Sequence, residues 1–263
     1  MEARQRRRKI GDVAETKSTS PFSRDYQRRQ KRRAILSEAA RLFNVRGARG
    51  TTLDDISAAL DLNKASLYYY VKSKDDLVFQ CYGASCEAFE AMLDEADRAG
   101  GDGAARLAAF VRSFFMAWKD ILEGRRDHMA ILSELRGLKP GHREKLAARY
   151  NAILGRVREF VQGGVADGSL RACNPTDASL AWFGLAQLTV LWLPGLATER
   201  FAEAADAFID VFFNGVAARG WAPAPGIAAA IGERPLTLDA EVDGKSPAFC
   251  RAATSIFNSK GFK

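Results

Sequence analysis

The pattern of residues 51–77, TTLDDISAALDLNKASLYYYVKSKDDL, predicts two short helices joined by a tight turn. Thr52 precedes an apolar-periodic run and is followed three residues later by Asp55, an arrangement close to a capping box that predicts a helix start. After the connection DLN, Asn63 caps the second short helix, KASLYYYV. Two short helices with so short a connection are typical of a helix-turn-helix unit.

The second of these helices has an apolar face and a polar face. We expect Leu67 and Val71 to pack inward, beside Ile56 and Leu60 of the preceding helix. The outward face is then formed by Lys64, Ser66, Tyr68 and Tyr69. Lysine and serine side chains bond base edges or phosphates, and tyrosine hydroxyls reach phosphate oxygens, so this face suits the major groove of DNA. The alternative is that the tyrosines are half-exposed surface aromatics.

Helical periodicity continues through most of the chain. One apolar stripe, in a helix that runs from near Tyr26 to Gly47 and Gly50, is formed by Ile35, Leu36, Ala39, Leu42 and Phe43. A fourth helix is expected to start at Ser73. Further helices are predicted at residues 104–123, 126–137, 141–167, 176–193 and 200–218. Because no stretch shows sustained strand alternation, we expect an all-α fold.

Residues 32–77 resemble the DNA-binding domain of TetR-family transcriptional regulators. The segments EAARLFNVRG, TTLDDIS and KASLYYYVKSKDDL match that family's first helix, its Thr-capped second helix, and its third helix running into the fourth. The later helices fit the family's second domain only in length and order. The resemblance implies an N-terminal three-helix helix-turn-helix DNA-binding domain followed by a helical ligand-binding and dimerisation bundle, with no catalytic activity.

The resemblance also implies roles for individual residues. Thr52 and Lys74 would bind backbone phosphates, and Tyr68 and Tyr69 would contact a phosphate or a thymine methyl group. The residues that open the recognition helix at the base edges would be Lys64, Ala65 and Ser66.

Two positions depart from the family pattern. Asp61 stands where the family usually has a glycine in the turn, and aspartate tolerates positive φ better than most residues. Val71 replaces a common phenylalanine, a smaller core residue that leaves the reading of bases unchanged.

Positive charge is concentrated at the N-terminus. Residues 1–50 hold 15 Lys and Arg against 5 Asp and Glu, in a chain whose net charge is +7. A basic end suggests contact with a polyanion such as DNA, although a solvated tail without a partner would look the same. Residues 1–24 lack apolar periodicity, and we expect them to form a disordered basic arm.

The domain organisation follows from these patterns. We expect a helix-turn-helix domain at residues 25–72, a helical effector-binding and dimerisation domain at 73–221, and a Pro- and Gly-rich linker at 222–247. The last segment, AFCRAATSIFNSKGFK at 248–263, matches AILSEAARLFNVRGAR at 34–49, including F-N-x-[RK]-G in the same register. This match predicts the first helix of a second, truncated helix-turn-helix module in a tandem protein. A C-terminal helix that only looks similar is the alternative.

Two groups of large apolar side chains are candidates for the regulatory sites of the second domain. By resemblance, an effector cavity would be lined by Phe114, Trp118, Met129, Leu132 and Tyr150. These same residues could equally fill the core of a bundle. The dimer surface would lie on the last two helices and include Trp182, Leu188, Trp192, Phe208 and Phe212. A mostly apolar lining favours a hydrophobic or amphipathic effector.

Several other functions find little support in the sequence. Residues 178–198 carry no charge, but Pro194 and two glycines interrupt this run, so we favour a buried helix over a membrane span. His128 and His142 are in different predicted helices, and the four cysteines lack metal-ligand spacing. We therefore expect no cofactor, no metal and no enzyme activity, and the cysteines suggest a reducing, cytoplasmic location.

These observations predict a sequence-specific DNA-binding regulator, most simply a repressor released from its double-stranded operator by a small hydrophobic effector. It would act as a homodimer, or as an intramolecular pseudo-dimer if a second module follows. A second hypothesis is a helical small-molecule-binding protein or enzyme with a vestigial helix-turn-helix. A third is a nonspecific DNA-binding protein driven by the basic arm, which would bind all sequences equally.

Overall fold

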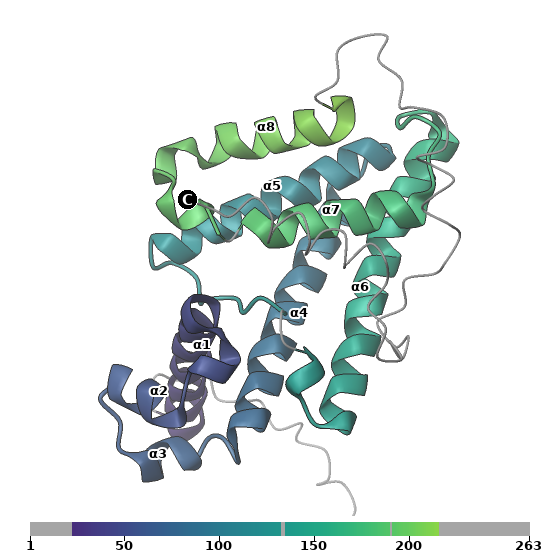
Figure 1. Cartoon of the computed structure of the whole chain (residues 1–263). Helices are drawn as coiled ribbons and strands as arrows, with labels where there is room; N and C mark the ends of the chain where they lie inside the picture. Colours follow the sequence, from purple (N-terminus) through teal and green to yellow (C-terminus); the bar gives the residue numbers. More distant parts are fainter. Residues whose placement is uncertain (1–22, 133–134, 190, 216–263) are drawn as a thin grey trace, which may run out of the picture. The chain divides into compact units, whose positions relative to one another are not determined.

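The computed structural model describes residues 23–132, 135–189 and 191–215, and every regular element within these ranges is a helix (Figure 1). The all-α prediction is confirmed for this part of the chain. Of the predicted arm at 1–24, residues 1–22 lie outside the described residues, as do the linker at 222–247 and the segment at 248–263. The end of the predicted arm needs correction, because Ser23 caps the first helix and Arg24 begins it. The described residues up to Phe213 belong to one compact unit.

The first three helices are α1 (Arg24–Gly50), α2 (Leu53–Ala59) and α3 (Lys64–Tyr68). Their apolar stripes meet in one core, in which Ile35, Phe43, Ile56, Leu67 and Val71 are buried, as the sequence predicts. Gly47 has φ of 73° and interrupts the helical conformation within α1, and the helix ends three residues later at Gly50. A positive φ is readily adopted only by glycine, so this residue sets the direction in which the chain leaves α1.

The remaining helices are α4 (Lys74–Ala99), α5 (Gly103–Leu122), α6 (Pro140–Asp167), α7 (Pro175–Thr189) and α8 (Phe201–Asn214). Helix α4 packs against α1 on one side and against α5 and α6 on the other, so it joins the N-terminal helices to the bundle (Figure 1). Arg149 and Arg156 of α6 form ion pairs with acidic residues of α4. These paired, half-exposed charges stabilise the α4–α6 contact only modestly.

Helices α5 and α6 approach each other closely at Gly103. A Cβ atom built on Gly103 would lie 2.1 Å from the backbone nitrogen of Gly164, so only glycine fits at this position. The first turn of α5 is also held by the end of α6, because the Gly103 amide donates to Asp167 at 2.9 Å and the Ala104 amide donates to Ser169 at 3.1 Å. These bonds satisfy amide groups that a helix start leaves without partners.

Two sequence-based helix predictions need correction. Residues 126–137 were expected to be helical, but 127–132 have no regular secondary structure and Leu135–Gly137 form a short 3-10 helix. Helix α5 ends before this segment at a turn in which Gly124 has φ of 72°. The helix predicted at 176–193 ends at Thr189, and Leu193–Gly195, which includes Pro194, forms a separate 3-10 turn.

None of the helices in the described ranges combines the length and the apolar character that crossing a bilayer requires.

Candidate nucleic-acid interface

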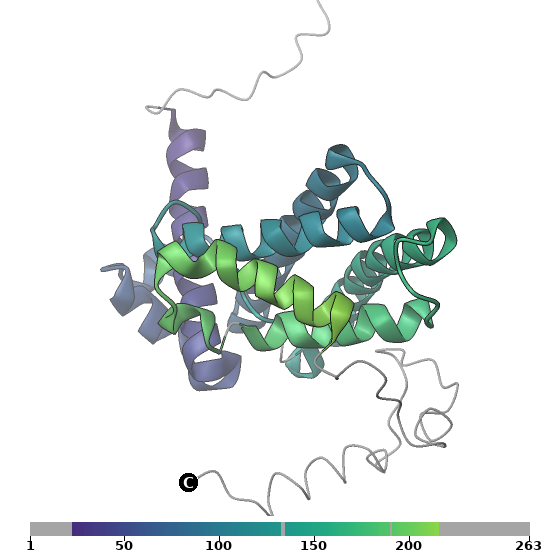
Figure 2. The same cartoon turned by 90° about the horizontal axis from the view of Figure 1, so that it is seen from above.

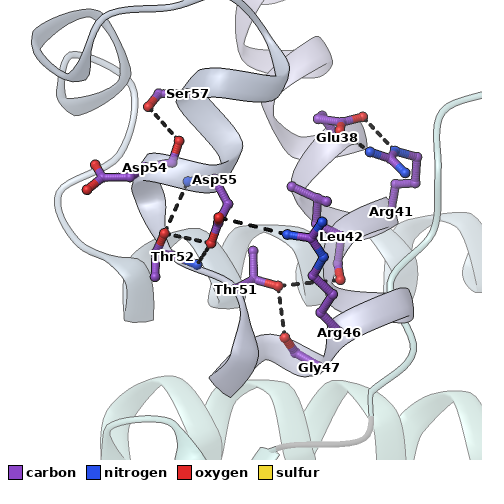
Figure 3. Close-up of polar contacts among 10 residues, drawn as sticks. All are labelled: Glu38, Arg41, Leu42, Arg46, Gly47, Thr51, Thr52, Asp54, Asp55 and Ser57. Atoms are coloured by element: carbon purple, nitrogen blue, oxygen red, sulfur yellow. Dashed lines mark hydrogen bonds and ion pairs between the residues drawn. The ribbon is translucent and has the colours of Figure 1, made fainter.

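The start of α2 is fixed by a complete capping box (Figure 3). The Asp55 amide donates to the Thr52 hydroxyl at 3.1 Å, and the Thr52 amide donates to the Asp55 carboxylate at 2.7 Å. The Thr52 hydroxyl in turn donates to the same carboxylate at 2.6 Å, and this bond is the main reason why the pKa of Asp55 is lowered. The cap predicted from the sequence is therefore confirmed, and it holds Thr52 at the exposed edge of α2.

The preceding residue, Thr51, anchors the same turn from the inside. Its side chain is fully buried, and its hydroxyl donates to the Gly47 carbonyl at 2.9 Å and lies 3.4 Å from the Leu42 carbonyl (Figure 3). The carbonyl groups at the end of a helix have no partner within the helix, and Thr51 supplies one. This contact fixes the position of α2 relative to α1.

The turn between α2 and α3 depends on Asp61. This residue has φ of 51°, and it is the only residue other than glycine with positive φ in the described part of the chain. Asn63 then caps α3, because its side-chain oxygen accepts from the Ser66 amide at 2.8 Å. The predicted tolerance of aspartate for this conformation is confirmed, and the turn sets the angle at which α3 leaves α2.

Helix α3 shows its predicted outward face to solvent. Leu67 and Val71 are buried, whereas Tyr68 and Tyr69 are 51% and 65% exposed. Lys64 and Ala65 are exposed as well, and Ser66 is half-buried. The short recognition helix therefore presents a lysine and two tyrosine hydroxyls on one accessible surface, which we call the α3 face, comprising Lys64, Ala65, Tyr68 and Tyr69.

Three of the predicted DNA-contacting side chains already have partners within the chain. The Lys64 ammonium group lies 2.8 Å from the Asp54 carboxylate, and this contact raises the pKa of Lys64. The Lys74 ammonium group donates to the Arg49 carbonyl at 3.1 Å, at the end of α1. Thr52 is likewise bonded to Asp55, so all three groups have a partner within the chain. The sequence pattern did not reveal the role of Asp54.

A segment without regular secondary structure at residues 127–132, which follows α5, crosses between α1 and α4. The His128 amide donates to the Ser37 hydroxyl of α1 at 3.0 Å, and the Ala130 amide donates to the Ser85 hydroxyl of α4 at 2.8 Å. We call residues 127–132 the strap. Its backbone bonds to side chains of both helices, so it connects the bundle to the helix-turn-helix unit.

Asn44 of α1 makes the most extensive contact with the strap. Its amide nitrogen donates to the Met129 carbonyl at 2.8 Å, and its oxygen accepts from the Ile131 amide at 2.9 Å. One side chain thus replaces two bonds that a helix would have supplied at this point of the backbone. These tertiary bonds hold Met129 and Ile131 outside a helix, and Asn44 is a functional candidate that the sequence pattern did not indicate.

A second connection joins the start of α4 to the start of α6. Asp75, in the first turn of α4, accepts from the Lys139 amide at 2.8 Å and lies 2.5 Å from the His142 imidazole nitrogen. The His142 ring also stacks on Phe79 with their centroids 4.2 Å apart. Asp75 directly follows Lys74, which is a predicted phosphate contact. A shift of α6 would therefore move the residue next to Lys74.

A hollow of about 330 Å³ opens between α1, α4 and the start of the strap. Its lining combines apolar residues, Leu36, Cys81 and Ala84, with arginines and acidic side chains. His128 also lines it, and burial is the main reason why the pKa of this histidine is lowered. No group of three or more potential metal-ligating side chains was found among the described residues.

The five predicted effector-lining residues lie in or against the bundle core. Phe114 and Trp118 of α5 are buried, and Phe114 stacks on Phe89 of α4. Tyr150 of α6 packs against Phe183 of α7, which also contacts Phe89. Met129 is buried and Leu132 half-buried, and both belong to the strap. Three of the five are thus joined in one aromatic network, and two lie on the segment that bonds to α1.

The predicted dimer residues divide into two groups. Trp182 is fully buried against Phe110 in the core of its own chain, with ring centroids 4.7 Å apart, so it has no surface to offer a partner. Leu188 is 57% exposed and Trp192 is 45% exposed, and Phe208 and Phe212 of α8 are half-buried. Exposed Leu185, Leu191 and Val211 accompany them. These side chains form an apolar surface over α7, the turn after it and α8.

Two family models match most of the described chain. One, described as "Bacterial regulatory proteins, tetR family", matches residues 35–81, and the other, described as "Tetracyclin repressor-like, C-terminal domain", matches residues 100–216. The first covers α2, α3, most of α1 and the start of α4. The second covers the bundle from α5 onward.

Known proteins with similar sequences or structures agree with these matches. The biofilm operon icaADBC HTH-type negative transcriptional regulator IcaR of Staphylococcus epidermidis is 46% identical over 43 residues, which are 16% of this chain and 23% of that regulator. The chain therefore spans about a quarter of the length of this curated relative.

Among solved structures, the TetR-family regulator PfmR of Thermus thermophilus superposes with a TM-score of 0.58 at 24% identity, covering 70% of this chain and 99% of PfmR. AibR in complex with isovaleryl coenzyme A and operator DNA superposes with a TM-score of 0.55 at 25% identity, covering 70% of this chain and 98% of AibR.

Proposed function

Because this chain belongs to the TetR family of bacterial regulatory proteins, we propose that it is a sequence-specific transcriptional repressor that a small effector releases from DNA. The observation that carries this proposal is the α3 face. A lysine and two tyrosines are exposed on a short helix whose position is fixed by two caps and a strained turn. Such a surface fits the major groove, where side chains reach base edges and phosphates.

The expected roles on DNA follow from the position of each residue. Lys64, at the first position of α3, would read a base edge together with Ala65 and Ser66. Tyr68 and Tyr69 would contact a phosphate or a thymine methyl group, while Thr52 and Lys74 would contact backbone phosphates on either side. Since lysine is a good partner for guanine O6 and N7, we expect a G·C pair opposite Lys64.

The decisive experiment measures sequence preference. A duplex is first selected by the full chain from a random-sequence pool, and its affinity is compared with that of a scrambled duplex of equal length and composition. Specific regulators typically prefer their site by about a thousandfold or more. Equal affinity for both duplexes would contradict specific regulation and favour a nonspecific DNA-binding protein.

The effector is proposed to bind among the aromatic residues of the bundle, near Trp118. The indole nitrogen of Trp118 is buried and has no hydrogen-bond partner among the described residues. A buried donor without an acceptor costs about 1–3 kcal/mol, so a ligand that supplies an oxygen would recover this energy. We infer an effector with an apolar body and a carbonyl oxygen, such as an acyl thioester of the kind bound to AibR.

Release from DNA is proposed to use the strap. Met129 and Leu132 would contact the effector with their side chains, while the Met129 carbonyl is bonded to Asn44 of α1. A ligand that moves these residues would therefore disturb α1 directly. Titration with acyl-coenzyme A esters, followed by tryptophan fluorescence and by release of labelled DNA, tests this step. Fluorescence changes without any release would contradict the proposed coupling.

The protein is proposed to act as a homodimer through the apolar surface over α7 and α8, with Leu188, Trp192, Phe208 and Phe212 as contact residues. Exposed apolar patches of this kind mark interaction surfaces. A two-fold dimer would place two α3 faces on the two halves of a palindromic operator. Such a repressor would work in the cytoplasm, where the DNA is, without a cofactor and without catalysis.

A helical small-molecule-binding protein or enzyme with a vestigial helix-turn-helix remains the competing function. That hypothesis does not explain why Lys64, Tyr68 and Tyr69 are exposed together. It would be favoured if an acyl substrate were turned over by a protein that shows no affinity for any duplex.

A further inference from the structure

The first eleven residues of α1, residues 24–34, form a helix with almost no core contacts. All of them are exposed except the half-buried Tyr26. Ser23 caps this segment by accepting from the Tyr26 amide at 3.1 Å, and six of its residues are lysine or arginine, against one acid, Asp25. Figure 2 shows these first turns extending away from the neighbouring helices.

Such a segment gains little from folding by itself. Most of the stability of a protein helix comes from packing an apolar face, and this segment has none to pack. A polar helix that stands free is stabilised by solvent-exposed pairs or by a partner. Six close positive charges repel one another, so an anionic partner would stabilise the segment more than water does.

The basic side chains point in two directions. Arg32 donates to Gln80 of α4 at 2.6 and 3.0 Å, and Arg33 is paired with Asp127 of the strap, so this side of the helix is turned toward the protein. Arg24, Arg28 and Lys31 are spaced by four and three residues and therefore share one face, and Arg32, four residues after Arg28, borders it. We call these three residues the α1 basic face.

The α1 basic face continues the α3 face. The Arg28 guanidinium lies over the ring of Tyr69, 5.4 Å from its centroid. Tyr69 directly follows α3 and is 65% exposed. An arginine placed on an exposed aromatic ring has its orientation fixed while its N–H groups stay available to an anion.

We propose that the α1 basic face binds the phosphate backbone of DNA next to the groove that α3 enters, as a contact that does not depend on base sequence. This inference rests on the proposed function, because it assumes that α3 is the base-reading helix. The inference adds a DNA-contacting element outside the helix-turn-helix. It also predicts that electrostatic contacts supply a larger share of the binding free energy than the helix-turn-helix alone would provide. The partner must present a regular row of phosphate groups.

The test compares two triple variants of the full chain. The first replaces Arg24, Arg28 and Lys31 by alanine, which keeps the helix because alanine has the highest helix propensity. The second is a matched control that removes three exposed positive charges far from α3, with Arg98, Arg158 and Arg171 replaced by alanine. Circular dichroism and melting temperature are recorded for both, so that a loss of folding is recognised.

Affinity for the selected and the scrambled duplex is then measured from about 50 to about 200 mM KCl. Each phosphate contact contributes about 0.9 to the slope of log affinity against log salt, so the first variant should lose between about two and three units of slope on both duplexes. The ratio of wild-type to variant affinity should shrink by roughly 40-fold across this range. The preference for the selected duplex should stay unchanged, and the control variant should keep the wild-type slope.

Other results would overturn the inference. A wild-type slope in the first variant would show that the α1 basic face does not touch DNA, and would leave a protein partner as the better explanation of its charge. An equal loss in both variants would show that only net charge matters. If the full chain prefers no selected duplex, the proposed function fails instead, while the slopes on the scrambled duplex still decide the inference.

Discussion

The Lys64 ammonium group and the Asp54 carboxylate are 2.8 Å apart on the surface where the recognition helix would meet DNA. Both side chains are more than 60% exposed, so the pair stabilises the fold little. If Lys64 reads a base, as proposed, the pair would affect DNA binding, because Lys64 would first have to leave Asp54. In the proposed complex, Asp54 would also place a negative charge close to the DNA phosphates.

Replacing Asp54 by asparagine should therefore strengthen DNA binding. Surface ion pairs are weak, and the expected gain is about two- to fivefold in affinity for selected and scrambled duplexes alike. Asp97→Asn is the matched control, since it breaks the ion pair with Arg156 at the far end of α4 and changes the net charge equally. Weaker binding by Asp54→Asn would show that the pair positions Lys64 for contact with DNA.

Lys64→Ala and Lys74→Ala should have different effects. If Lys64 reads a base, its loss should reduce affinity for the selected duplex by about 5- to 150-fold and relax the preference at one position. Lys74→Ala should weaken binding to all duplexes equally and lower the salt slope by about one. Binding to a panel of single-base variants distinguishes the two, and an unchanged preference profile for Lys64→Ala would exclude it from base reading.

Asn44→Ala should destabilise the protein and loosen the strap. The change leaves the Met129 carbonyl and the Ile131 amide without their partner, and an unsatisfied buried group costs about 1–3 kcal/mol. Urea unfolding measures this loss. Ser37→Ala, which removes a single bond to the strap, should cost less. If both variants unfold at the wild-type urea concentration, the strap is held by other contacts.

The α5–α6 contact should not tolerate a larger residue at position 103. In Gly103→Ala the new methyl group would meet the backbone of α6, and overpacking of this kind costs about 1–3 kcal/mol or more. Gly155→Ala is the control: it lies within α6 with nothing within 4 Å of its new Cβ, and should gain about 0.5–1 kcal/mol from helix propensity. Thermal melts of both variants give the comparison, and equal melting temperatures would contradict it.

Leu188→Glu should separate the proposed dimer. A charge buried in an apolar interface without a partner costs several kcal/mol, which exceeds what a single apolar contact contributes. Val45→Glu adds the same charge at another exposed apolar position, on α1, and should leave the dimer intact. Sedimentation velocity reports the mass of each variant. A dimeric Leu188→Glu protein would place the interface elsewhere.

Local sequence signals predicted the helix-turn-helix unit well. The caps at Thr52, Asn63 and Ser73 and the positive φ of Asp61 all depend on residues within four positions of one another, and all are present. The inward packing of Leu67 follows from helical periodicity alone. Short-range hydrogen bonds and periodicity are the information that a single sequence carries most directly.

Features that depend on distant residues were missed. The strap depends on bonds to Ser37, Asn44 and Ser85, which lie 45 to 91 positions away in the sequence. The pairing of Lys64 with Asp54 and the burial of Trp182 likewise follow from how helices pack against one another. Helix propensity favoured a helix at 126–137, but tertiary hydrogen bonds determined the outcome.

The strap also has a consequence for the kind of response this protein can give. Its backbone is hydrogen-bonded to Ser37 and Asn44 of α1 and to Ser85 of α4, so two helices hold one short stretch of chain. Hydrogen bonds weaken steeply when their atoms separate or lose alignment, so a displacement of about 1 Å is enough to break such a tie. A partial slide of α1 past α4 would therefore lose several ties without forming new ones. We therefore expect each molecule to occupy one of a few discrete arrangements. As the concentration of the proposed effector rises, the fraction of molecules that have switched should increase, and each of these molecules should have switched completely.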